Sequence, residues 1–359
     1  MKSFLSACFV LLFSSITFAQ SNPQWIRYQT ISPDGSTIVF TYKGDLYSVA
    51  TSGGDATQLT FHEAHDYMPV WSKDGKTIAF ASDRYGNFDI YTMSAKGGAA
   101  KRLTFHSNDE KPFTFSADDK NVVFGATRMD TKEHRQYPTG SQPELYSVPV
   151  SGGRVDQIFT IPAEFVQVNK SGTQMVYHDK KGGENEFRKH HTSSITRDIW
   201  IYDTKSKTHK MITSFKGEDR QPIYSADEKS LFYLSESSGN FNVHKLSLAS
   251  PTQTTQLTKF TTHPVRFLSM GNGTLSFGYD GELYTMKEGE QPKKVKVNIR
   301  TQEKSNSDKF ITINGGVQEM AIAPNGKEIA FVARGEVFVT SIDGSLTKRI
   351  TNTPETERF

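Results

Sequence analysis

The sequence predicts an all-β fold, namely a six-bladed β-propeller of four-stranded antiparallel blades followed by the first blade of a second propeller. A turn of the type Ser-Pro-Asp-Gly, followed by an apolar strand, recurs seven times in the 359 residues. Its copies begin at residues 32, 72, 116, 169, 225, 270 and 323, a spacing of 40 to 56 residues. No long amphipathic helical pattern interrupts these units. Strand-rich repeats of this period are typical of a β-propeller.

The first unit shows the predicted plan of a blade. A short strand at 27–31 enters the turn, in which Pro33 fixes φ, Asp34 bonds the local backbone and Gly35 accepts the final geometry. The apolar run after the turn predicts a second strand over 37–42, and glycine turns then lead into two more strands, at 45–49 and 57–60. The aspartates of the repeated turn are therefore interpreted as structural residues and not as an acidic site.

The repeat divides the chain into four predicted parts. Residues 1–19 are a signal peptide, 20–298 the six-bladed propeller, 299–309 a polar linker and 310–359 the first blade of a second, truncated propeller. A seven-bladed ring that includes the last unit is the alternative to this division. No N-terminal strand is evidently reserved for the last blade, so the ring is expected to close through packing alone.

The amino-terminal segment and the charge limit the function. Lys2 is followed by an apolar run and Ala19 by a cleavage site, so export to the periplasm or outside the cell is expected. The only cysteine, Cys8, lies in this segment, and the remaining chain then has no thiol chemistry. The formal net charge of +3 gives no indication of nucleic-acid binding, and no later run is long enough to span a membrane.

An insertion in the fourth unit carries the one concentrated polar cluster, formed by Arg188, Lys189, His190, His191 and Arg197. One interpretation is a basic loop that contacts a peptide carboxylate or a neighbouring domain. A solvated loop without a partner is the second interpretation. A metal site is the third, although adjacent histidines point apart on an extended backbone and no further ligand is close in sequence. No catalytic, cofactor-binding or metal-binding residue is predicted.

The repeat resembles that of TolB-type propellers, especially at residues 83–91, which read Asp-Arg-Tyr-Gly-Asn-Phe-Asp-Ile-Tyr. The chain as a whole is more similar to the N-terminal part of tricorn-type serine peptidases. In those peptidases, a six-bladed propeller is followed by a seven-bladed one, a PDZ domain and the catalytic domains. The exported start, six units, a linker and a new unit near Phe310 match that order, and the insertion ending at Trp200 is similar to that of bacterial homologues.

This resemblance implies a non-catalytic module of an exported tricorn-like serine peptidase, which gates or guides peptides to or from a catalytic domain absent from this chain. The alternative is a stand-alone TolB-like propeller that binds a protein in the periplasm. The propeller of a prolyl-oligopeptidase-like enzyme is a weaker third option. The implied partners are peptides or the downstream PDZ and peptidase domains, a homo-oligomer is left open, and no cofactor is implied.

Overall fold

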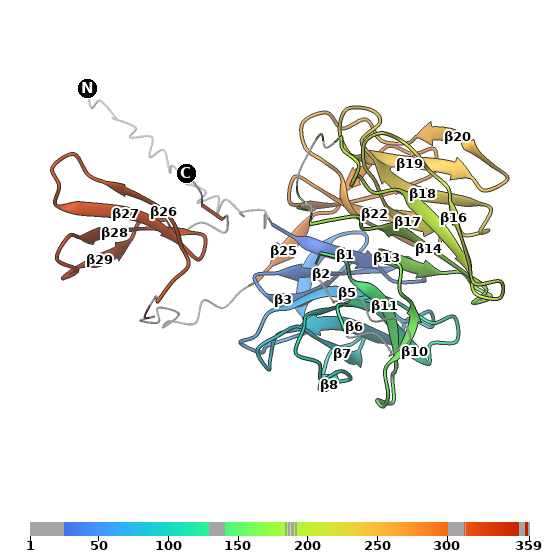
Figure 1. Cartoon of the computed structure of the whole chain (residues 1–359), viewed down its shortest axis with the longest axis horizontal. Helices are drawn as coiled ribbons and strands as arrows, with labels where there is room; N and C mark the ends of the chain where they lie inside the picture. The colour runs from blue at the N-terminus through green and yellow to red at the C-terminus, as the bar shows by residue number, and fades with distance from the viewer. Residues whose placement is uncertain are drawn as a thin grey trace, which may run out of the picture.

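The computed structural model describes residues 25–128, 141–183, 185, 187, 190, 192–300, 312, 314–351 and 356–357. Every regular element in these ranges is a β-strand, and the strands form seven sheets. Six sheets are arranged as blades around a common axis, and the seventh lies apart from them (Figure 1). The predicted all-β fold of four-stranded antiparallel blades is confirmed.

The first three blades follow one another from the inner strand outwards. Blade 1 consists of β1 (Arg27–Ile31), β2 (Thr37–Tyr42), β3 (Asp45–Ala50) and β4 (Gly54–Gln58). Blade 2 consists of β5 (Asp66–Trp71), β6 (Thr77–Ser82), β7 (Asp89–Ser94) and β8 (Lys101–Arg102). Blade 3 consists of β9 (Glu110–Phe115), β10 (Asn121–Ala126), β11 (Glu144–Pro149) and β12 (Asp156–Phe159).

The next three blades have the same order and complete the ring. Blade 4 consists of β13 (Ala163–Val168), β14 (Gln174–Asp179), β15 (Ile199–Asp203) and β16 (Thr208–Met211). Blade 5 consists of β17 (Asp219–Tyr224), β18 (Ser230–Ser235), β19 (Asn242–Ser247) and β20 (Ser250–Gln256). Blade 6 consists of β21 (Arg266–Gly271), β22 (Thr274–Tyr279), β23 (Glu282–Lys287) and β24 (Lys293–Lys294).

The second strand of each blade is deeply buried, because both of its faces pack against neighbouring blades. Ile38, Val39 and Phe40 on β2 have no exposed surface, and Ile78, Ala79 and Phe80 on β6 repeat this pattern. Burial of consecutive residues explains why the repeat carries an apolar run after each turn and not a strict alternation. Each face of a blade is buried only where a neighbouring blade covers it.

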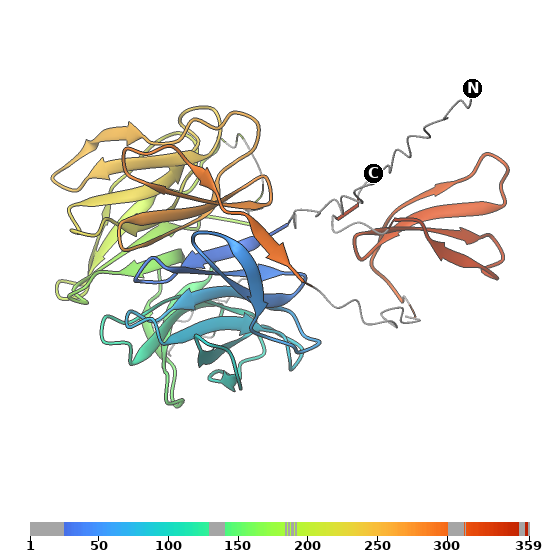
Figure 2. The same ribbon diagram turned by 180° about the vertical axis from the view of Figure 1, so that it is seen from behind.

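Backbone hydrogen bonds close the ring between blades 6 and 1, and the expectation of closure through packing alone is wrong. After β24 the chain crosses to blade 1, where β25 (Val297–Ile299) pairs in parallel with the outer strand β4 (Figure 2). At the inner strands, Ile31 N donates to Ser269 Oγ at 3.2 Å. The crossing segment was not recognisable in sequence, because three residues carry no distinct strand pattern. It also extends through Ile299, the first residue of the predicted linker.

The seventh sheet consists of β26 (Val317–Ile322), β27 (Glu328–Ala333), β28 (Glu336–Ser341) and β29 (Thr347–Arg349). It has the blade topology, and it lies outside the ring in both views (Figures 1 and 2). The ring closes between β1 and β21 without it, which favours six blades over the seven-bladed alternative. Its assignment to a second propeller stays a prediction. Residues 1–19, the predicted signal peptide, lie outside the described residues.

Candidate functional site: the central funnel

The repeated turns form the rim of a funnel on one face of the ring. In the first turn Ser32 Oγ donates to Asp34 Oδ1 at 2.5 Å, and the same carboxylate oxygen accepts from Ser36 N at 3.0 Å. The hydrogen bond from Ser32 is the main reason that the pKa of Asp34 is lowered. Ser72 and Asp74 repeat this bond at 2.7 Å in blade 2. The turn aspartates are thus occupied by their own turns, as predicted.

Two of the turns have a carboxylate where the others have glycine. Asp119 and Glu228 take this position with φ of 58° and 56°, in the left-handed region that side chains avoid. The Asp119 carboxylate accepts from Lys73 N at 2.6 Å and from Asp74 N at 2.9 Å, across the blade boundary. Glu228 accepts from Lys170 N at 2.6 Å in the same way. These hydrogen bonds between adjacent turns offset the backbone strain and fix the rim.

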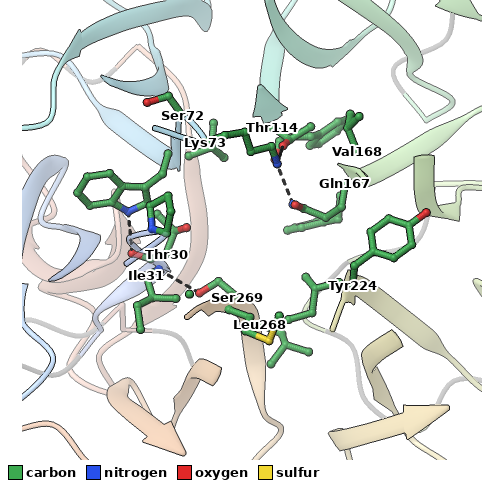
Figure 3. Close-up of a pocket in the computed structure, with 18 of the residues that line it drawn as sticks. Thr30, Ile31, Ser72, Lys73, Thr114, Gln167, Val168, Tyr224, Leu268 and Ser269 are labelled. Atoms are coloured by element: carbon green, nitrogen blue, oxygen red, sulfur yellow. Dashed lines mark hydrogen bonds between the residues drawn. The ribbon is translucent and has the colours of Figure 1, made fainter. Parts of the chain in front are cut away.

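Inside the rim lies a cavity of about 580 Å³, surrounded by the innermost strands of all six blades (Figure 3). Its wall is mixed, with apolar side chains such as Ile31, Val168 and Leu268 beside polar ones such as Thr30 and Gln167. The indole Nε1 of Trp71 donates to Thr30 O at 3.2 Å and so joins blade 2 to blade 1. The cavity has the size and composition of a site for a small organic ligand or a short peptide segment.

Lys73 places a cationic group in this funnel. Its side chain is exposed to the cavity, and Nζ donates to Thr114 Oγ1 of the next blade at 3.2 Å. Desolvation by the surrounding blades lowers the pKa of Lys73, while the carboxylates of Asp119 and Glu228 oppose this effect. Glu228 lines the funnel wall together with Lys73 and Lys170. The funnel therefore presents a localised cation without a large net charge.

A ring of bulged residues forms the floor of the funnel. The pairing register shifts within all six innermost strands, at the same point in five of them and one residue later in blade 3, which indicates a β-bulge in each. The bulged residues are Tyr28, Met68, Phe113, Phe165, Gln221 and Phe267, and all of them except Gln221 line the funnel. All but Phe113 have a positive φ of 51° to 57°. The repetition of this conformation in five blades shows that it is built into the fold.

These side chains contact one another across blade boundaries. The rings of Tyr28 and Phe267 are 4.6 Å apart between centroids, and those of Phe113 and Phe165 are 6.1 Å apart. Met68 is packed with Phe113 and is 7% exposed. Phe165 and Phe267 line the funnel on one side and a second cavity of about 20 Å³ on the other. These two floor residues thus lie between the two cavities.

Below the floor, buried charges join blades 4 and 5. Arg197 is 2% exposed, and its guanidinium lies 3.3 Å from Glu218 Oε1 and 3.8 Å from Glu164 Oε2. His178 Nδ1 accepts from Gln221 N at 3.0 Å and so supports a floor residue. Desolvation lowers the pKa of His178, which favours the neutral acceptor form. Sequence reasoning did not find this cluster, because its members are far apart in the chain.

The sequence-predicted cluster is not brought together as one site among the described residues. Arg197 is inside this charged cluster, whereas His190 is exposed and its backbone N donates to Glu236 Oε1 of blade 5 at 2.9 Å. Arg188, Lys189 and His191 lie outside the described residues. The contact of this loop with a peptide or a further domain stays a prediction. In the described ranges no three histidine, cysteine or acidic side chains gather as a metal site.

The family follows from the match of the sequence. Residues 23–292 match the Tricorn protease N-terminal β-propeller domain. The chain therefore belongs to the family of tricorn N-terminal β-propellers, and the resemblance stated from its repeats is confirmed. A propeller of this family is a module found with peptidases. In the part of the chain that the structure describes, no helix has the length and apolar character needed to cross a membrane.

Solved structures share the fold of this chain. A crystal structure of the tricorn protease superimposes with a TM-score of 0.67 and 19% identity, covering 92% of this chain and 32% of that one. The crystal structure of a puromycin hydrolase S511A mutant superimposes with a TM-score of 0.53 and 11% identity, covering 92% of this chain and 54% of that one. Dipeptidyl-peptidase 5 of Porphyromonas gingivalis is 35% identical over 72 residues, which are 17% of this chain and 10% of that protein. The chain thus spans only part of these proteins.

Proposed function

We propose that this chain is the non-catalytic propeller module of an exported tricorn-like serine peptidase, and that its channel guides peptides to or from a catalytic domain. The observation that carries the proposal is the funnel on the axis of a tricorn-family ring, which is wide at the rim and bordered by side chains at the floor. A folded protein does not fit a cavity of about 580 Å³, so such a path selects extended chains.

The floor gives the path a gating step. Phe165 and Phe267, whose rings can change rotamer, line both cavities. Rotamer changes of side chains cost far less than separation of hydrogen-bonded blades, so a peptide passes by displacing these rings. The backbone pairing of β25 with β4 supports this route over opening of the ring at its seam.

A chemical plug in the funnel tests the proposal. Lys73→Cys, labelled with a bulky maleimide in the full-length protein that the reading frame encodes, should lower peptide turnover by about tenfold. Lys76→Cys is the matched control, because that side chain is 82% exposed on the outside of the same turn. This chain alone should cleave no peptide. Equal turnover of the two labelled variants would contradict the channel role.

The alternative is a stand-alone TolB-like propeller that binds a protein partner. The repeat favours it as much as it favours the peptidase module, because TolB-type propellers have the same turns. A full-length reading frame without a peptidase domain would support this alternative. In that case the maleimide-labelled Lys73→Cys and Lys76→Cys variants would be compared for binding of the protein partner and not for peptide turnover.

A further inference from the structure

A side chain of the blade 4 insertion, Phe187, reaches the small cavity next to the floor residues. Phe187 lines the small cavity below the floor, together with Phe165, Gln221 and Phe267. Phe187 is 38% exposed, so part of the residue also faces solvent. The same insertion is attached to blade 5 through the bond from His190 N to Glu236. Phe187 therefore lies where a peptide would reach the floor from this cavity.

Two arginines hold Phe187, and we name Arg27 and Arg266 the arginine clamp. They occupy equivalent positions, each the first residue of the innermost strand in blades 1 and 6. The guanidinium carbons of Arg27 and Arg266 lie 5.1 Å and 5.0 Å from the centroid of the Phe187 ring. Arg266 Nη2 also donates to Phe187 O at 3.0 Å. The clamp thus binds an aromatic ring and the main-chain carbonyl of the same residue.

Arg220 of blade 5, which like Arg27 and Arg266 directly precedes the bulge of its innermost strand, makes different contacts. Arg220 Nε binds Glu218 Oε2 at 2.6 Å, and its guanidinium stacks on Phe241 of its own blade. Arg220 is thus part of the buried core, whereas the clamp arginines contact a residue from a distant insertion. Contacts to such a segment can be exchanged without unfolding a blade.

We infer that the arginine clamp is a binding site for an aromatic residue of an extended peptide, and that Phe187 occupies it as an intramolecular competitor. Any aromatic residue in a peptide presents the same two groups, a ring and a backbone carbonyl. A C-terminal aromatic residue presents a carboxylate in place of the carbonyl, which Arg266 binds through a charge-assisted hydrogen bond. This inference deepens the proposed function and rests on it only for the origin of the peptide.

Removal of the competitor tests the inference directly. Phe187→Ala should bind the peptide acetyl-Gly-Phe-Gly-amide about tenfold more tightly than the unaltered chain, since a tethered group competes at high effective concentration. Phe105→Ala is the matched control, because Phe105 is 73% exposed and also stacks on an arginine, Arg102, at 4.6 Å. That control should leave the affinity unchanged. Isothermal titration calorimetry on the purified chain measures each affinity and needs no peptidase domain.

Second variants separate the clamp from a structural effect. Arg266→Met, added to Phe187→Ala, should remove the gain in affinity. If this double variant does not fold, Arg27→Met combined with Phe187→Ala replaces it in the same measurement. A peptide with cyclohexylalanine in place of phenylalanine should bind about fivefold more weakly, because it lacks the π-face. The free acid acetyl-Gly-Phe, compared with its amide, distinguishes a C-terminal from an internal aromatic residue.

Two results would overturn the inference. One is equal affinity of Phe187→Ala and the unaltered chain for the phenylalanine peptide. The other is a gain in affinity that persists when the clamp arginines are replaced. Either result leaves the proposed function standing, because the funnel label experiment does not involve the clamp. Conversely, peptide binding by the clamp together with no effect of the funnel label would reject only the channel role.

Discussion

The blades of the ring and the seventh sheet have the same repeat but differ in burial. Phe40 of blade 1 and Phe331 of the seventh sheet occupy the same position, and each stacks on an aromatic ring of the third strand at an interplanar angle of 16°. Phe40 is 0% exposed, whereas Phe331 is only half-buried. Met320 and Ile322 on β26 are 68% and 64% exposed. The repeat thus encodes the blade, and the neighbouring blades provide the burial.

The largest expected difference between the two regions is the loss of stability when Phe40 or Phe331 is replaced by alanine. Phe40→Ala should lower the free energy of unfolding of the ring by about 3–5 kcal/mol, because it leaves a cavity between two blades. Phe331→Ala should leave the ring transition unchanged, because the main contacts of β27 are with β26 and β28 of its own sheet. Urea denaturation followed by circular dichroism measures both. Equal losses would show that the seventh sheet is packed on the ring.

The seam of the ring gives the second expected effect. A Cβ at Gly271 would lie 1.9 Å from Ser32 O of blade 1, whereas a Cβ at Gly315, next to the seventh sheet, would meet no atom within 4 Å. Gly271→Ala should therefore cost about 2–3 kcal/mol through overpacking, and Gly315→Ala almost nothing. Thermal unfolding of both variants checks this. An unchanged midpoint for Gly271→Ala would mean that the seam opens readily.

The third difference is a buried carboxylate in the ring. The innermost strand β17 of blade 5 starts with Asp219, whereas the first strand of the seventh sheet, β26, starts with Val317. Burial raises the pKa of Asp219 to about 6, above its value in the unfolded chain. Between about pH 4 and 6 the folded state keeps a proton that the unfolded state has lost, so stability falls as pH rises through this window.

The corresponding variant is Asp219→Asn, which removes the ionisable group. It should raise the free energy of unfolding by roughly 2 kcal/mol at pH 8 and have no such effect at pH 4. Urea unfolding at several pH values measures the difference. A gain that is equal at both pH values would exclude the ionisation of Asp219 as its cause, and Val317→Asn, on the exposed β26, serves as a control without this dependence.

The smallest expected effect concerns the turns. Asp119→Gly removes two hydrogen bonds to the neighbouring turn but also relieves a left-handed conformation. We expect the free energy of unfolding to fall by about 1 kcal/mol, because two charge-assisted hydrogen bonds stabilise the fold by more than one left-handed residue costs. In the seventh sheet the position is already Gly326, and no neighbouring turn contacts it. A gain in stability for Asp119→Gly would show that the bonds between turns contribute little.

The sequence could predict those features that each blade determines locally. The Ser-Pro-Asp-Gly turns, the apolar second strands and the count of six units follow from bonds and periods within about fifty residues. The structural role of Asp34 follows likewise from Ser32 and Ser36. The candidate cluster was predicted less well, because contiguity in sequence suggested that Arg197 belongs with His190. Arg197 instead lies among charges that blades 4 and 5 contribute from distant positions.

The sequence by itself thus determined the blade, its turn and the family, because hydrogen bonding and alternation along neighbouring strands are local. The tertiary structure alone decided the closure by β25, the floor of the funnel and the clamp around Phe187. Each of these joins residues more than a hundred positions apart, such as Tyr28 with Phe267 and Gly54 with Val297. Contacts of that kind arise only when the ring brings its first and last blades together.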